Sequence, residues 1–278
     1  MSFSHPGPLR CTVVGTGSLA MSMIPALQGA GYPVTQLLAR NETTRELYGG
    51  RYGIVARTGA PHELAPDSEL VLLCVSDQAI APVAASLLPY LPPQALLVHC
   101  SGSIPLDAMA GPVGRRGVLY PLQTFTRTAA VPLHSVPIFV EGEADAHEPL
   151  RHLADRLSER VFALDSDERR RLHLAAVFVN NFSNLLYRIA ADLLPAGLDF
   201  GVFEPIVHEH VRKVLAYQPA HSQSGPALRG DRITLASHLA LLREHPEWQA
   251  LYRYLSGLIN PDMQAWLQAG PEPGQWPD

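Results

Sequence analysis

Residues 11–20 have the sequence Cys11-Thr12-Val13-Val14-Gly15-Thr16-Gly17-Ser18-Leu19-Ala20, an apolar run followed by small residues at fixed spacing. The first glycine permits a tight turn, and the second lets the backbone approach a phosphate group. Alanine at the end lets a helix pack on the strand, while the N–H groups of the helix N-terminus attract an anion. We therefore expect a strand, a helix and a dinucleotide-binding turn between them, formed by Gly15, Thr16, Gly17, Ser18, Leu19 and Ala20.

Short aliphatic and β-branched runs alternate with amphipathic or loop segments from Leu9 to about Leu164. This alternation is typical of βαβ units and a parallel sheet. The expected strands are 11–14, 34–39, 70–75, 95–99, 117–120, 138–141 and 161–164. The predicted fold class is α/β, with an N-terminal Rossmann dinucleotide-binding domain followed by an all-helical C-terminal domain.

The sequence changes character after Asp165, where helical periodicity replaces the strand pattern. An acidic cap region, Asp165-Ser166-Asp167-Glu168, begins a long helix expected over 166–194. Further helices are expected at 203–217, 231–244, 246–258 and 261–269, and the tail from Gly270 is expected to be frayed. We therefore expect two domains, 1–165 and 166–278.

The end of the second expected strand indicates which dinucleotide is preferred. An acidic residue there would bind the ribose 2′-hydroxyl and exclude a 2′-phosphate. This chain instead has Arg40 and Asn41, with Thr43 just beyond. Arg40 can pair with a phosphate, and Asn41 and Thr43 can donate hydrogen bonds, which favours NADP over NAD. The alternative is that Arg40 only faces solvent.

Two more strand ends belong to the same carboxyl edge of the sheet, where open α/β folds bind ligands. Ser76 and Asp77 follow the strand 70–75, and His99-Cys100-Ser101-Gly102 follows the strand 95–99. We expect Ser76 and Asp77 to contact the ribose or nicotinamide. A role for Asp77 as a helix cap is an equal alternative.

The composition limits the partners and the location of the protein. A formal net charge of −5 gives no general reason to expect nucleic acid or an anionic membrane as a partner. The N-terminal segment has no apolar signal region, and no run of about 18 apolar residues occurs. Cys11, Cys74 and Cys100 lie in or beside apolar runs, which indicates reduced core thiols and a cytoplasmic protein.

Several motifs resemble those of known families. The turn at 15–20, Val75-Ser76-Asp77 and His99-Cys100-Ser101-Gly102 resemble the superfamily of pyrroline-5-carboxylate reductases and 3-hydroxyacid dehydrogenases. A more specific resemblance is to the DUF2520 family, and three long motifs carry it. They are Tyr120-Pro121-Leu122-Gln123-Thr124-Phe125, Arg171-Leu172-His173-Leu174-Ala175-Ala176-Val177-Phe178-Val179-Asn180-Asn181-Phe182 and Gly225-Pro226-Ala227-Leu228-Arg229-Gly230-Asp231. Thr234 and His238, which follow the third motif, belong to the same resemblance.

The resemblance implies NADP-dependent oxidoreductase activity on a small-molecule substrate and a homodimer formed largely through the helical domain. Ser101 matches by position a serine that binds substrate in the hydroxyacid dehydrogenases. Those enzymes also use a lysine on the first helix of the second domain. This chain departs from them, because His173 stands there and its only lysine is Lys213.

Polar residues form a stripe on the helix expected over 166–194. At about 100° per residue, His173, Asn180, Asn184 and Tyr187 fall on one side, and the apolar opposite side is expected to be buried. We expect His173 to donate or accept a proton at the reacting group, with Asn180 or Asn184 orienting the substrate oxygen. The alternative is a polar network between helices or at a dimer interface.

The motif at 225–231 adds one more candidate. Arg229 is expected to bind a carboxylate or phosphate of the substrate, or else to tie the loop to a neighbouring helix. Asp231 is a plausible N-cap for the next helix, which carries Thr234 and His238. No metal site is expected, because His208 and His210 diverge on a helix and no carboxylate cluster accompanies them.

These residues predict an NADP-dependent oxidoreductase that transfers hydride to or from a small polar carbonyl, imine or hydroxyacid compound at the cleft between the domains. The alternative is an NADP-binding redox sensor or assembly protein without turnover.

Overall fold

The computed structural model describes residues 8–110 and 114–269 of the 278-residue chain. The described residues form two compact units, one ending at Asn181 and the other beginning at Phe182. The tail from Gly270, expected to be frayed, and residues 1–7 of the N-terminal segment lie outside the described residues.

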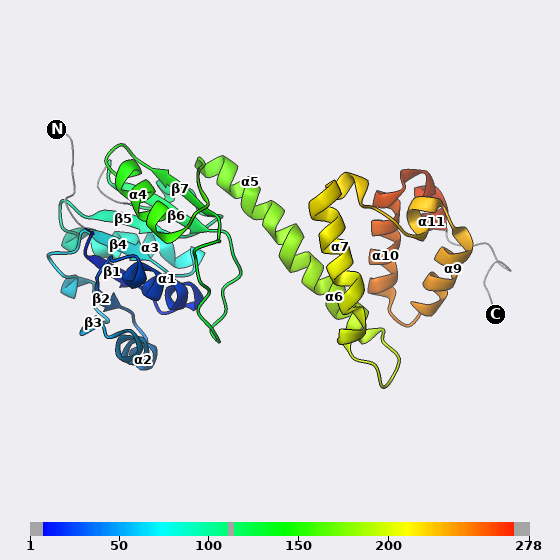
Figure 1. Cartoon of the computed structure of the whole chain (residues 1–278), viewed down its shortest axis with the longest axis horizontal. Helices are drawn as coiled ribbons and strands as arrows, with labels where there is room; N and C mark the ends of the chain where they lie inside the picture. Colours follow the sequence, from blue (N-terminus) through cyan, green and yellow to red (C-terminus); the bar gives the residue numbers. More distant parts are fainter. Residues whose placement is uncertain (1–7, 111–113, 270–278) are drawn as a thin grey trace. The chain divides into compact units, whose positions relative to one another are not determined.

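The first unit is built on an eight-stranded sheet with the order β3-β2-β1-β4-β5-β6-β7-β8 (Figure 1). Neighbouring strands run parallel except for β6 and β7, which are antiparallel. The strands are β1 Cys11–Val14, β2 Val34–Leu38, β3 Ala56–Thr58, β4 Leu70–Leu73, β5 Leu96–His99, β6 Arg116–Pro121, β7 Ile138–Gly142 and β8 Val161–Ala163. The seven expected strands and the α/β fold class are thus confirmed, whereas the three-residue β3 was not expected.

Helices cover both faces of this sheet. They are α1 Ser18–Gly29, α2 Glu42–Tyr52, α3 Asp77–Leu87 and α4 His147–Leu157, with short 3-10 turns at Pro61–Glu63, Leu88–Tyr90 and Leu106–Ala108. One buried cluster joins apolar residues of α1 and α4 to one face, and a second joins α3 to the other. The two-residue period of a strand explains this arrangement, since Leu70 and Leu72 of β4 belong to the first cluster and Val71 and Leu73 to the second.

A long helical run begins at Asp165 and crosses from one compact unit to the other. It consists of α5 Ser166–Ala176, a π-helical segment Val177–Phe182 and α6 Ser183–Asp192. The expected acidic cap is confirmed, because Asp165 and Glu168 form a reciprocal capping box. The units divide at Asn181, inside the helix, because the first turn of α5 is fixed to the loop after β5 and to β7 by Arg169, as described below.

The second unit is all-helical. Its helices are α6, α7 Glu204–Tyr217, α8 Pro226–Arg229, α9 Arg232–Leu241, α10 Pro246–Ile259 and α11 Gln264–Ala269, with 3-10 turns at Phe200–Phe203, Pro219–His221 and Pro261–Met263. A buried apolar cluster of Leu235, Leu239, Met263 and Leu267 holds α9 against the C-terminal turns. None of the helices in the described residues is long and apolar enough to cross a membrane.

Candidate active site

The glycine-rich turn has the geometry that its sequence predicts. Gly15 has a φ of +104°, and a Cβ placed on it would lie 2.6 Å from the carbonyl oxygen of Cys74. Only glycine fits there, because a side chain would be strained in φ and would collide with a backbone atom. Gly17 is the N-cap of α1, and the first turn of α1 contains no acidic side chain. The N-terminus of α1 therefore presents its N–H groups and positive dipole to an anion.

A cavity of about 720 Å³ opens beside this turn. Its walls come from the turn, the end of β2, α3 and the segment after β6. The residues that matter for a charged ligand are Gly15, Thr16, Gly17, Arg40, Asn41, Thr44, Ser76 and Arg127. Among the described residues, this lining includes two arginines and no carboxylate. Its size, its charge and the glycine at Gly15 all fit the phosphates and ribose of a dinucleotide.

The residues after β2 take more specific roles than the sequence indicates. Arg40 is exposed and lines the cavity. Asn41 also lines the cavity and is the N-cap of α2, since its side chain accepts a 2.9 Å hydrogen bond from the Thr44 N–H. Thr44 contacts the hydroxyl of Thr16 at 2.7 Å, whereas Thr43 does not belong to the lining. Thr44, and not the expected Thr43, is therefore the threonine that lines the candidate ligand site.

Ser76 and Asp77 lie at the start of α3. Ser76 is the N-cap residue but makes no capping bond through its side chain, so its hydroxyl is available to the cavity that it lines. Asp77 is the first helical residue. The alternative in which Asp77 caps the helix is therefore wrong, because the chain enters the helix one residue earlier.

A tyrosine and a histidine meet at the carboxyl edge of the sheet. The hydroxyl of Tyr120, the fifth residue of β6, lies 3.1 Å from Nδ1 of His173 on α5. Their rings meet edge to face, with centroids 6.1 Å apart. Burial raises the pKa of Tyr120 to about 12, with an opposing effect from the Arg169 cation and a reinforcing one from the Asp77 carboxylate. Tyr120 is therefore a neutral phenol near neutral pH, able to hydrogen-bond with His173.

Gly102 makes room for this pair. A Cβ built on Gly102 would lie 2.6 Å from Cζ of Tyr120 and 2.7 Å from Nδ1 of His173. The loop after β5 thus approaches both rings more closely than any residue with a side chain could.

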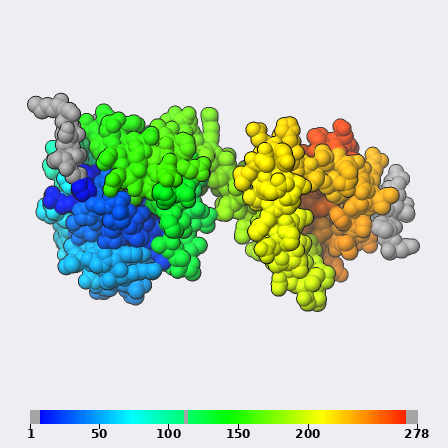
Figure 2. Space-filling model, in the orientation of Figure 1, coloured from blue at the N-terminus to red at the C-terminus, as the bar shows by residue number. Residues whose placement is uncertain are grey.

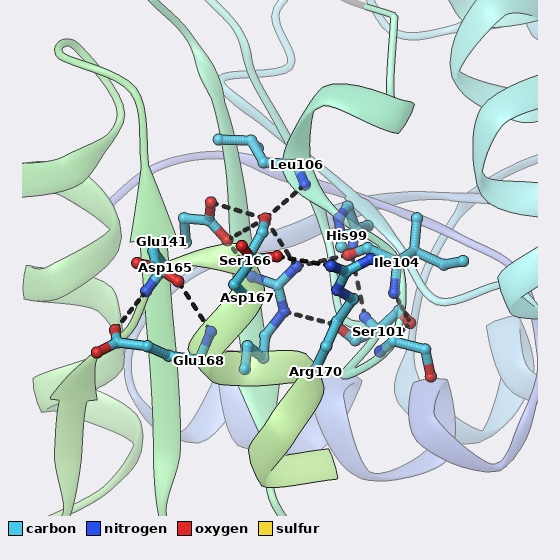
Figure 3. Close-up of polar contacts among 12 residues, drawn as sticks. His99, Ser101, Ile104, Leu106, Glu141, Asp165, Ser166, Asp167, Glu168 and Arg170 are labelled. Carbon is cyan, nitrogen blue, oxygen red and sulfur yellow. Dashed lines mark hydrogen bonds and ion pairs between the residues drawn. The ribbon is translucent and has the colours of Figure 1, made fainter. Parts of the chain in front are cut away.

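A buried arginine fixes α5 to this loop. Arg169 is 1% exposed, and its Nε donates to the Ser101 carbonyl at 3.1 Å. The guanidinium also pairs with the carboxylate of Glu141 on β7 and donates to the Ile104 carbonyl. Ser166 completes the network, donating to Glu141 and accepting from the Leu106 N–H at 3.0 Å (Figure 3). Because His173 lies one helical turn after Arg169, this network positions the histidine.

Ser101 and His99 support the loop from within. The hydroxyl of Ser101 accepts hydrogen bonds from the N–H groups of Ser103 and Ile104, at 3.0 and 3.1 Å. Nδ1 of His99 accepts from the Ser101 N–H at 3.1 Å, so His99 is neutral with its proton on Nε2. Burial, assisted by the Arg169 cation, lowers the pKa of His99 to about 3. Ser101 therefore stabilises the turn as a hydrogen-bond acceptor, and toward a substrate its hydroxyl can act only as a hydrogen-bond donor.

The other predicted residues are more dispersed. Asn180 lies in the π-helical segment and Asn184 beyond it, and both are exposed. A π turn takes an extra residue, so the uniform 100° spacing that placed Asn180 and Asn184 on the stripe of His173 is interrupted. The apolar side of this helix was expected to be buried, yet it is exposed, with Phe178 at 61%.

Arg229 ends the four-residue helix α8 in the second unit and is exposed. Asp231 is confirmed as the N-cap of α9, where it accepts from the N–H and hydroxyl of Thr234. His238 hydrogen-bonds through Nδ1 to the hydroxyl of Tyr252 at 2.8 Å. Among the described residues, no three His, Cys, Asp or Glu side chains gather as a metal ion would require.

Sequence reasoning missed Tyr120, Arg127 and Arg169 as members of the site. Tyr120 carried a signal, because it ends an expected strand at the same edge as Ser76 and Ser101. Arg169 carried a weaker one, as a charged residue one turn before His173. Nothing in the sequence around Arg127 indicates that its loop returns to the glycine-rich turn.

Two family models match the chain. The model "Domain of unknown function (DUF2520)" matches residues 136–259, and "NADP oxidoreductase coenzyme F420-dependent" matches residues 10–102. A crystal structure from Bacteroides fragilis, described provisionally as an NADP oxidoreductase, is 34% identical. The alignment covers 91% of this chain and 98% of that chain, with a TM-score of 0.84. The chain belongs to the DUF2520 family.

More distant relatives of this DUF2520 protein share parts of it or only its fold. A pyrroline-5-carboxylate reductase from Pseudomonas aeruginosa is 30% identical over 109 residues, which are 38% of this chain and 39% of the reductase. The chain thus matches well under half the length of that curated relative. A reductive aminase from Aspergillus terreus in complex with NADPH and ethyl levulinate is 14% identical over 93% of this chain and 94% of that chain. Its TM-score of 0.66 indicates a common fold.

Proposed function

We propose that this DUF2520 protein is an NADP-dependent oxidoreductase that transfers hydride to or from a small polar carbonyl, imine or hydroxyacid compound. The observation that carries the proposal is the Tyr120–His173 hydrogen bond, held at the carboxyl edge of a sheet whose glycine-rich turn borders a carboxylate-free cavity. The activities ascribed to the Bacteroides fragilis protein, the Pseudomonas aeruginosa reductase and the Aspergillus terreus aminase support the same class of reaction.

Bound NADPH supplies the hydride in this class of reaction, and the chain must supply or accept a proton. In the doubly protonated ring of His173, Nδ1–H donates to the Tyr120 hydroxyl oxygen and the second proton is on Nε2. His173 then transfers the Nε2 proton to the substrate oxygen or nitrogen and is left as a neutral imidazole, whose Nδ1–H still donates to the Tyr120 hydroxyl. Asn180 orients the reacting oxygen, and the Ser101 hydroxyl binds the polar end of the substrate.

The end of β2 supports a preference for NADP over NAD. Among the described residues of the cavity lining, none is acidic and able to compete for Arg40, and Asn41 and Thr44 line the same cavity. A guanidinium pairs with a 2′-phosphate through charge-assisted hydrogen bonds.

A second copy of the chain is the partner that we propose, bound through the helical part. Leu174 and Val179 on the long helical run are 58% and 77% exposed in a single chain. Large apolar side chains gathered on one exposed helix are typical of a protein–protein interface. Light scattering coupled to gel filtration should give twice the chain mass, and Val179→Glu should give the single-chain mass.

The enzymatic proposal is tested by following NADPH absorbance while small keto acids, imines and hydroxyacids are supplied. Turnover above background is expected for at least one class, and His173→Ala should abolish it with an unchanged Kd for NADPH. Saturable NADPH binding without turnover on any class would count against an enzyme.

That last outcome would favour a cofactor-binding sensor without turnover. The observation favouring this second candidate is the location of the lysine of the chain, away from the first helix of the second domain. Lys213, the only lysine of the chain, lies in α7 and pairs with Glu209 at 3.3 Å, so the site has no ammonium group from the first helix of the second domain. In a sensor, His173→Ala would change neither NADPH affinity nor any reaction rate.

A further inference from the structure

The segment that joins β6 to β7 is much longer than the antiparallel pairing of these strands requires. Hairpin loops usually contain about two to five residues, whereas this connection occupies residues 122–137. Phe125 and Val131 pack against the buried cluster that contains α1, and Leu133 and Val136 are part of it. The segment therefore packs beside α1, and Figure 2 shows green atoms of this part of the chain next to dark blue ones.

A hydrogen bond ties this segment to α1. Ser22, the fifth residue of α1, is 1% exposed, and its hydroxyl accepts from the Val131 N–H at 2.9 Å. Four residues separate Ser22 from the start of α1, about 6 Å along the helix axis. The anchor thus holds the segment next to the end of α1 that faces the cavity.

Arg127 lies four residues before this anchor and lines the same cavity as Gly15, Thr16 and Gly17. Its side chain is exposed, and no carboxylate among the described residues lies within ion-pair distance of it. An arginine at an acid-free cavity, beside a helix N-terminus, is suited to an anion that bridges both.

We propose that Arg127 binds the pyrophosphate of the dinucleotide and that the 122–137 segment is a strap that holds it there. The proposal rests on the proposed function, since it requires a dinucleotide in this cavity. The pyrophosphate is the appropriate group because the strap is anchored on α1, whose N-terminus meets the glycine-rich turn. The residues that bind the 2′-phosphate are instead those after β2, namely Arg40, Asn41 and Thr44.

Equilibrium titration with NADPH and NADH tests this assignment. Both dinucleotides carry the pyrophosphate and only NADPH carries the 2′-phosphate, so Arg127→Gln should raise both Kd values by a similar factor of about ten. Arg40→Gln should raise the Kd for NADPH alone. The matched control is Arg160→Gln, which removes an exposed arginine next to β8, at the opposite edge of the sheet from β3, and should change neither Kd.

A second variant tests the strap. Ser22→Ala removes the acceptor for the Val131 N–H and should raise the Kd for NADPH about threefold in the wild-type background. In the Arg127→Gln background the same substitution should have no further effect, because its action passes through Arg127. Urea unfolding should show the same Ser22→Ala destabilisation in both backgrounds, which separates the effect on binding from an effect on the fold.

The outcomes separate this inference from the function on which it rests. If the wild-type chain binds neither dinucleotide, both fail. If it binds NADPH and Arg127→Gln binds as tightly, the strap inference alone is overturned. A loss confined to NADPH would also overturn it, because Arg127 would then contact the 2′-phosphate. Additive effects of Ser22→Ala and Arg127→Gln would refute the positioning role of the strap.

Discussion

Gly102→Ala is expected to separate the two rings on which the proposed chemistry depends. The new Cβ would lie 2.6 Å from Cζ of Tyr120 and 2.7 Å from Nδ1 of His173, while ordinary contacts begin near 3.4 Å. The two rings must therefore move away from the new Cβ by about 0.7 to 0.8 Å. They cannot do so freely, because Tyr120 is only 8% exposed and α5 is fixed by Arg169.

A displacement of about 1 Å in a catalytic group can reduce the rate about 10²-fold. We therefore expect kcat to fall by about that factor, while the Kd for NADPH stays within twofold because the cavity lining is untouched. Overpacking of this kind should also cost about 1–3 kcal/mol of unfolding free energy. The assay is NADPH oxidation with the best substrate from the screen, accompanied by a fluorescence titration of NADPH.

Gly50→Ala is the matched control, because a Cβ on Gly50 in α2 would meet nothing within 4 Å. It should leave kcat unchanged and should not destabilise the fold. Full activity in Gly102→Ala would refute the reasoning, since the Tyr120–His173 contact could then be disrupted without consequence.

Three further predictions concern charge. Unfolded His99 titrates near pH 6.5 and the buried ring near 3, so its stabilising effect is present above about pH 6.5 and is lost as the pH falls toward 3. Between pH 7.5 and 5.5 this histidine alone should lower the unfolding free energy by about 1.4 kcal/mol, and urea titrations of His99→Asn should lack that part of the slope. Arg169→Met removes a buried cation, leaving the partly buried Glu141 carboxylate without its ion-pair partner, and should cost about 3–5 kcal/mol in thermal unfolding. The exposed neighbour is the control, since Arg170→Met should cost under about 1 kcal/mol, and equal losses would contradict the buried network. Arg40→Gln should raise the Kd for NADPH about tenfold and change the Kd for NADH by less than twofold. An equal loss of affinity for both dinucleotides would show that Arg40 does not bind the 2′-phosphate.

The sheet could be predicted from the sequence because its strands are buried on both faces and read as short apolar runs between turns. The turn at Gly15 could be predicted because only glycine has both the required φ and the required space. The strand β3 was missed because Ala56 and Arg57 are exposed and give no apolar signal.

The rest of the site depends on contacts between residues that are distant in sequence. Tyr120 and His173 are brought together by the sheet order and by Arg169, which no local pattern encodes. We expected Thr43 rather than Thr44 at the ligand site, because the cap made by Asn41, which sets the start of α2, was not recognised. The stripe through Asn184 assumed a regular helix, and the π-helical segment changed its spacing.

The most direct test of the central claim is a titration of the wild-type chain and of Gly15→Ala with NADPH, followed by nicotinamide fluorescence. Saturation at one NADPH per wild-type chain is expected, with a Kd below that for NADH. The Kd of a folded Gly15→Ala chain should be at least about tenfold higher, because a Cβ there collides with the Cys74 carbonyl and displaces the turn. No saturable binding by the wild-type chain, or equal affinity in both chains, would contradict the claim that this turn binds the dinucleotide.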